Sequence, residues 1–85
     1  MKNREHAIRV IAQNNYKVHG MFDIFLEISG QKHFVMSHRH NGILFGMLKN
    51  GMTLGKLRSL KGRDKGQVKY LLTVVDEFIS EEMPA

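Results

Sequence analysis

Residues 18–40 read VHGMFDIFLEISGQKHFVMSHRH, and this stretch decides the fold class. Within residues 18–28 the apolar side chains fall on alternate positions, which is the period of a half-buried strand. The face that we expect to be buried carries Val18, Phe22, Ile24, Leu26 and Ile28. A second strand is expected at 32–40, so the two segments predict an antiparallel hairpin.

The link between these strands, Ser29-Gly30-Gln31, predicts a three-residue turn with the glycine at positive φ. In that register Leu26 lies beside Phe34 and Ile24 lies beside Met36 on the inner face. A turn of only two residues would place polar side chains of the second strand against the apolar face. We therefore expect the three-residue turn.

Segments on either side of the hairpin extend the fold. Residues 3–14 carry Ala7, Ile8, Ile11 and Ala12 on one stripe, which predicts a short amphipathic helix. Asn41-Gly42 is typical of a type I′ turn, so residues 43–48 are predicted to form a third strand. The three strands then make an antiparallel meander.

The C-terminal part of the chain is expected to be helical. Leucines recur every three residues behind Thr53, which predicts a short helix over 53–62, although a fourth strand in this segment is the alternative. Asp64 and Gln67 have the spacing of a capping box, and the long apolar stripe after them predicts a helix from about residue 65 to 82. The expected fold is α+β with the order α-β-β-β-α-α and helices packed on a three-stranded antiparallel meander.

Length and composition restrict the class of protein. The 85 residues predict one small domain, 1–85, whose acidic end at 81–85 is expected to fray because its glutamates oppose the helix macrodipole. The chain has no cysteine, so the core has no disulfide. No apolar run approaches the roughly 18 residues of a membrane span. We therefore expect a cytoplasmic protein without a membrane partner.

Basic residues are concentrated in the middle of the chain. Residues 32–69 hold nine of the thirteen lysines and arginines and a single acid, Asp64. Residues 70–85 hold four acids and no base. This distribution favours a polyanionic partner.

We expect this basic segment to contact the backbone phosphates of a nucleic acid, either duplex RNA or duplex DNA. The candidate contacts are Lys49, Lys56, Arg58, Lys61, Arg63, Lys65 and Lys69. Free N–H groups at helix starts would add to phosphate binding. Few aromatic residues are interleaved with the bases, so the pattern favours backbone recognition over base stacking. A solubilising surface is the alternative interpretation.

The sequence predicts no catalytic residue, metal site or cofactor. His38 and His40 share one side of a strand, but His19 is expected on the other face and no acidic third ligand is evident. Ser37 and His38 point to opposite faces and cannot form a dyad. Asp23 is expected across from Ser37 on the outer face without a histidine in reach of both.

Apolar residues are also expected on the second face of the sheet, namely Phe25, Val35, Leu44 and Leu48. One layer of helices does not cover both faces of a small sheet, so this set predicts an interface with a second copy or with another protein. A homo-oligomeric or adaptor module is thus the second functional hypothesis. The salt dependence of binding distinguishes the nucleic-acid hypothesis from the adaptor hypothesis, because phosphate binding weakens steeply as salt rises and apolar association does not.

Overall fold

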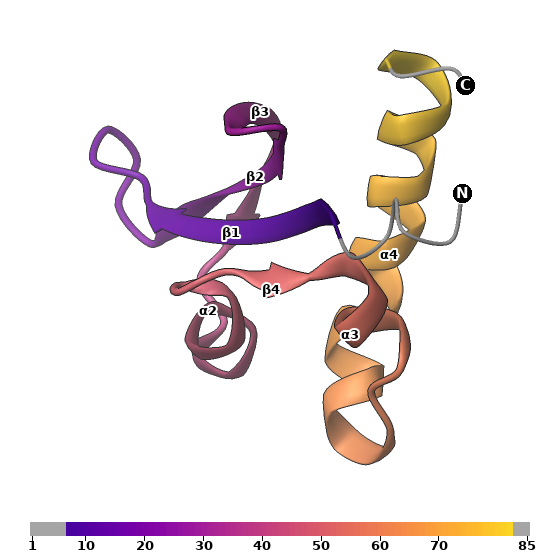
Figure 1. The fold of residues 1–85 in the computed structure, drawn as a ribbon. Coiled ribbons are helices and arrows are strands. Elements are labelled where there is room, and N and C mark those ends of the chain that lie inside the picture. The colour runs from indigo at the N-terminus through magenta and orange to yellow at the C-terminus, as the bar shows by residue number, and fades with distance from the viewer. Residues whose placement is uncertain (1–6, 83–85) are drawn as a thin grey trace.

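A four-stranded antiparallel sheet and the helices beside it make up the part of the chain that the computed structural model describes, residues 7–82 (Figure 1). The strand order is β3-β2-β1-β4. The strands are β1 (Ile8–Asn14), β2 (Met21–Ile28), β3 (Gln31–Arg39) and β4 (Met52–Thr53), and the helices are α2 (Gly42–Leu48), α3 (Leu54–Arg58) and α4 (Gly62–Glu82). The predicted α+β class is confirmed.

β1 occupies most of the segment that was predicted to be a helix. Ile8, Val10 and Ala12 are buried and point to one side of the strand, while Arg9 and Gln13 belong to the other side and are exposed. The helix prediction is wrong here. The buried residues at alternate positions include the β-branched Ile8 and Val10, which favour a strand, and every residue of β1 pairs with β2. Positions 3–6 of the predicted helix lie outside the described residues.

The hairpin between β2 and β3 turns at two residues, not three. Ser29 and Gly30 both have positive φ, 53° and 80°, and Ile28 pairs with Gln31 across them. Positive φ at both central positions is the geometry of a type I′ turn, which matches the right-handed twist of paired strands. Val18, predicted to begin the strand, lies in the preceding loop and is exposed.

An irregularity in β3 restores the predicted register further from the turn. Phe25 pairs with Phe34 and Ile24 pairs with Met36, which leaves Val35 as the extra residue of a β-bulge. The predicted pairing of Ile24 with Met36 is therefore confirmed, and that of Leu26 with Phe34 is wrong. The bulge keeps Ser37 and Arg39 off the apolar face, and it leaves Phe34 on the outer one.

The predicted third strand is the helix α2. Asn41 does not begin a hairpin turn but caps this helix, because its Oδ1 accepts a hydrogen bond from the Leu44 amide at 3.1 Å. Leu44 and Leu48 are one helical turn apart and are buried together, with exposed fractions of 1% and 0%. Neither residue lies on a sheet face, so both are core residues and not part of an exposed interface.

Both alternatives for residues 52–61 occur in part. Met52 and Thr53 pair with β1 as the edge strand β4. Thr53 then caps α3 as predicted, accepting a hydrogen bond from the Lys56 amide at 3.2 Å. The helix ends at Arg58, earlier than the predicted end near residue 62.

α4 has 21 residues and is about 30 Å long at 1.5 Å per residue. It begins at Gly62, before the predicted capping box, so the box does not form. Gln67 instead accepts a hydrogen bond from the amide of Asn41 at 2.9 Å, which joins α4 to the start of α2. The helix continues through Glu82, and residues 83–85 of the predicted frayed end lie outside the described residues.

The core lies between one face of the sheet and the helices. Buried side chains of the strands all belong to the face that contains Val10 and Leu26, and the helices contribute leucines and valines of α2, α3 and α4. Outward-facing residues of the same strands are exposed or half-buried. We call the face that contains Ile11, Phe25 and Phe34 the open sheet face.

Candidate nucleic-acid interface

Five of the predicted phosphate contacts lie on α3, the following link and the first half of α4. All five side chains are exposed. This group is Lys56, Lys61, Arg63, Lys65 and Lys69, and we call it the basic surface. Figure 1 shows α3 beside the N-terminal half of α4, and the two helices are in contact. Lys49 follows α2 and lies on a different element.

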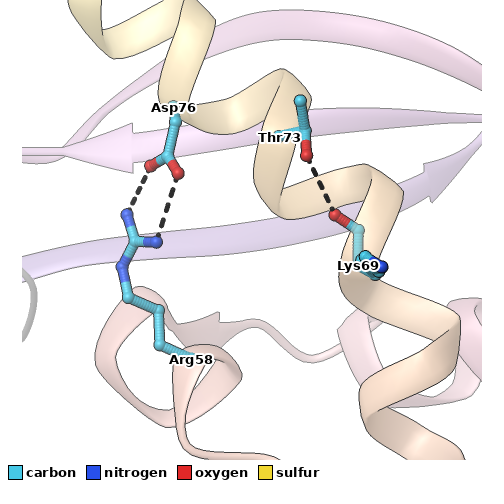
Figure 2. A network of polar contacts seen from close by, with 4 residues as sticks. All are labelled: Arg58, Lys69, Thr73 and Asp76. Atoms are coloured by element: carbon cyan, nitrogen blue, oxygen red, sulfur yellow. Dashed lines mark hydrogen bonds and ion pairs between the residues drawn. The ribbon is translucent and has the colours of Figure 1, made fainter.

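Arg58, the remaining predicted contact, is engaged by an acid. Its guanidinium donates to both carboxylate oxygens of Asp76 on α4, at 2.5 and 3.3 Å (Figure 2). Both side chains are partly exposed, so the pair adds little to stability. The forked geometry nevertheless joins α3 to α4 at the surface. We therefore assign Arg58 a positioning role and leave it out of the basic surface.

The charges on α4 run against its macrodipole. The N-terminal half carries Arg63, Lys65 and Lys69, while the C-terminal half carries Asp76, Glu77 and Glu81. A helix is stabilised by acids near its N-terminus and bases near its C-terminus, and α4 has mostly the reverse. Helix stability therefore does not explain this arrangement. The bases add to the positive potential that the helix N-terminus already creates.

The middle of α4 holds Lys69 with its charge outward. Thr73 donates a hydrogen bond to the Lys69 carbonyl at 3.3 Å, within the helix (Figure 2). The Lys69 side chain is exposed. With Asp64 counted, the basic surface has a formal charge of +4, five bases less one acid. Potentials of this kind raise the local concentration of a polyanion.

The histidines pack as aromatic residues. His38 stacks on Phe22 with ring centroids 5.4 Å apart, and His40 lies 5.7 Å from Phe45. His40 also lines a cavity of about 510 Å³ together with His19, which corrects the expectation that His19 lies on the other side. Within residues 7–82 no group of three histidine, cysteine or acidic side chains is placed to hold a metal.

Polar residues at one end of the open sheet face form a structural network. Asp23 accepts hydrogen bonds from Ser37 at 2.8 Å and from Asn15 at 3.0 Å. The predicted pairing of Asp23 with Ser37 is confirmed. Asn15 also accepts from the amides of Lys17 and Val18, so its side chain orders the loop between β1 and β2. Ser37 is thus held by the Asp23 carboxylate.

The four residues predicted as an oligomer interface do not share a surface. Phe25 is on the open sheet face and half-buried. Val35, the bulge residue, lines a groove with Val74 and Phe78 of α4. Leu44 and Leu48 are in the core, as described above. The exposed fraction of Phe34 is 54%, and this residue was not predicted to be on the surface.

The open sheet face carries a row of apolar side chains, of which the sequence predicted Phe25 but not Ile11 or Phe34. Ile11 pairs with Phe25, and Phe25 pairs with Phe34, so the three lie side by side across β1, β2 and β3. The two aromatic rings meet edge to face with centroids 5.8 Å apart. Ser29-Gly30 was the available signal, because a two-residue turn turns Phe34 outward.

Comparison of the chain with protein-family models, with curated proteins and with solved structures finds no match. None of the helices in residues 7–82 is long and apolar enough to cross a membrane. We therefore infer the function of the protein from the geometry and charge of the described residues.

Proposed function

We propose that this protein binds nucleic acid by contacting backbone phosphates with the basic surface. The observation that supports the proposal most is the placement of Arg63 and Lys65 in the first turn of a long helix, where they oppose the macrodipole, with Lys69 one turn further along. Bases at this end lower the stability of the isolated helix, and an anionic ligand that binds there would offset this loss by neutralising their charge. Phosphate is such a ligand.

The bases of the basic surface lie on elements that the core holds in place. α3 and the start of α4 are joined by a short link, and buried side chains of both helices belong to the same core. Lys56 on α3 and Lys65 on α4 are therefore carried by elements whose relative positions are fixed. Fixed cations lose less conformational freedom on binding than cations on a loose segment.

A pair of matched variants tests the proposal. The first variant, Arg63→Gln with Lys65→Gln, removes two charges from the basic surface. The control, Lys17→Gln with Arg39→Gln, also removes one lysine and one arginine, but from the region around the start of β2. Fluorescence anisotropy with labelled single-stranded and duplex oligonucleotides measures the affinity at low salt. We expect the first variant to bind more weakly than the second for every sequence tested.

Equal affinities of the two variants would contradict the proposal, because both have lost the same net charge and differ only in its place. The same holds if the unaltered protein binds nothing below about 100 μM at low salt, the weak end of nonspecific binding. The basic surface would then serve solubility.

A further inference from the structure

The open sheet face has the composition of a base-stacking surface. Phe34 is the most exposed aromatic ring on a strand, and Phe25 stands behind it in the same row. Lys32 lies next to them, with its Nζ 5.0 Å from the centroid of the Phe25 ring. Many proteins bind unpaired bases by stacking them on an exposed aromatic side chain of an antiparallel sheet, with cations nearby.

The charges on this face favour an anionic ligand at its β4 side. In the row next to the aromatic pair, Arg9, Glu27 and Lys32 lie in register across β1, β2 and β3. Glu27 is thus flanked by two cations, and the row keeps one net positive charge. The Arg9 guanidinium donates to the Asn50 carbonyl at 2.7 Å, which fixes it at the edge of the sheet.

The open sheet face meets the start of α3 at the β4 edge of the sheet. Arg9 pairs with Thr53 of β4, and Thr53 caps α3, whose first turn contains Lys56. From β3 to β4 the sheet spans about 14 Å, three steps of roughly 4.8 Å. A strand of nucleic acid that crosses the sheet from Phe34 would therefore come to the edge where α3 begins, and it would turn there onto the helices that carry the basic surface.

From this arrangement we infer that the ligand of the basic surface is single-stranded nucleic acid and that one of its bases stacks on Phe34. The inference rests on the proposed function. A duplex hides the faces of its bases within its own stack, so a ring on a flat sheet has no base to contact. In a single strand every base has a free face.

A second copy of the chain fits this face less well. A stable protein interface uses about 20–30 residues a side, whereas the apolar row consists of Ile11, Phe25 and Phe34. Two such faces in contact would also bury the charges of Arg9, Glu27 and Lys32, which is costly unless each charge is paired across the interface. The nucleic acid is therefore the occupant that the charges favour.

The test uses the variant Phe34→Trp. Because the chain has no tryptophan of its own, all tryptophan fluorescence of this variant comes from position 34. Its emission is followed during titration with a thymidine strand of about ten nucleotides, a length within the usual site sizes of single-strand binders, and with a duplex of the same length. We expect quenching by the single strand and little change with the duplex.

Affinity measurements complete the test. Phe34→Ala is expected to weaken single-strand binding by about 5- to 150-fold, the range found for loss of one stacking residue, with an unchanged salt dependence. Ile43→Ala, which shortens an exposed apolar side chain on α2, is the matched control and should bind as the parent does. Far-ultraviolet circular dichroism checks that all variants are folded.

Three outcomes would overturn the inference. One is equal binding of duplex and single strand. Another is a Phe34→Ala variant that binds the single strand as the parent does while the Arg63→Gln, Lys65→Gln variant is weakened, which would leave the proposed function intact. The third is a parent dimer that Phe34→Ala converts to monomer in sedimentation without any change in oligonucleotide affinity, because the open sheet face would then belong to a second copy.

Discussion

Loss of two charges from the basic surface should change the salt dependence of binding by an amount that follows from the structure. The perturbation is Arg63→Gln with Lys65→Gln. Each cation that contacts a phosphate of a single strand contributes about −0.7 to the slope of log affinity against log salt. With the five cations of the basic surface in contact, the parent slope is about −3.5, and the variant slope is about −2.1.

These slopes become fold-changes when salt is varied. A fourfold rise in salt should weaken the parent by about 130-fold and the variant by about 20-fold. The Lys17→Gln, Arg39→Gln control should stay near 130-fold, because Lys17 lies in the loop before β2 and Arg39 pairs with the first residue of β2, both outside the basic surface. Anisotropy titrations at four or more salt concentrations give each slope directly.

A variant slope equal to that of the parent would refute this reasoning, since it would show that Arg63 and Lys65 release no counterions on binding. A control slope that falls as far as the variant slope would refute it as well. Binding would then depend on the net charge of the whole chain and not on the basic surface.

Three further predictions concern the scaffold. Asn41→Ala removes the cap of α2 and the hydrogen bond to Gln67, so the free energy of unfolding should fall by about 1–2 kcal/mol in urea titration with an unchanged slope; a loss below a few tenths would contradict the capping role. Gly51→Ala puts a methyl group against the Arg9 guanidinium at a φ of 86°, and we expect a loss of about 1–2 kcal/mol or more; a stable variant would show that the turn is not left-handed. A double-mutant cycle on Arg58 and Asp76 should give a coupling below about 1 kcal/mol that shrinks in high salt, and a larger, salt-independent coupling would mean that the pair is less exposed than described.

The α+β class was predictable because the strongest signals are local. The alternation in β2 and the apolar stripe of α4 are properties of neighbouring residues, and both elements form where the pattern places them. The basic surface was predictable for the same reason. Its residues are close in sequence, and helices and a short link keep them close in space.

What could not be predicted depends on partners distant in the chain or on a single inserted residue. This segment fits a helix through Ala7, Ile8, Ile11 and Ala12 about as well as a strand through Ile8, Val10 and Ala12, and the pairing with β2 decides between them. Asn41 suits a hairpin turn and a helix cap equally, and burial of the leucines of α2 decides that case.

The sequence predicts Phe25 on the second face of the sheet but not Phe34, because of the bulge at Val35. A two-residue turn alone is disfavoured by the sequence, since it would carry polar residues of β3 into the core. The inserted residue removes that cost beyond Phe34 but leaves Phe34 itself outward. An irregularity of this kind has no sequence signature in this strand, so the outward position of Phe34 is seen only in the structure.

The most direct test of the central claim is a map of the binding surface by nuclear magnetic resonance. Backbone amide shifts of the nitrogen-15-labelled protein are followed as a thymidine oligonucleotide of about ten nucleotides is added. We predict the largest shifts within residues 56–69, and unchanged amides in the loop 15–20 and in residues 76–81. Shifts concentrated in 76–81 or in 15–20, or no shifts at saturating oligonucleotide, would contradict the assignment of the basic surface as the phosphate-binding site.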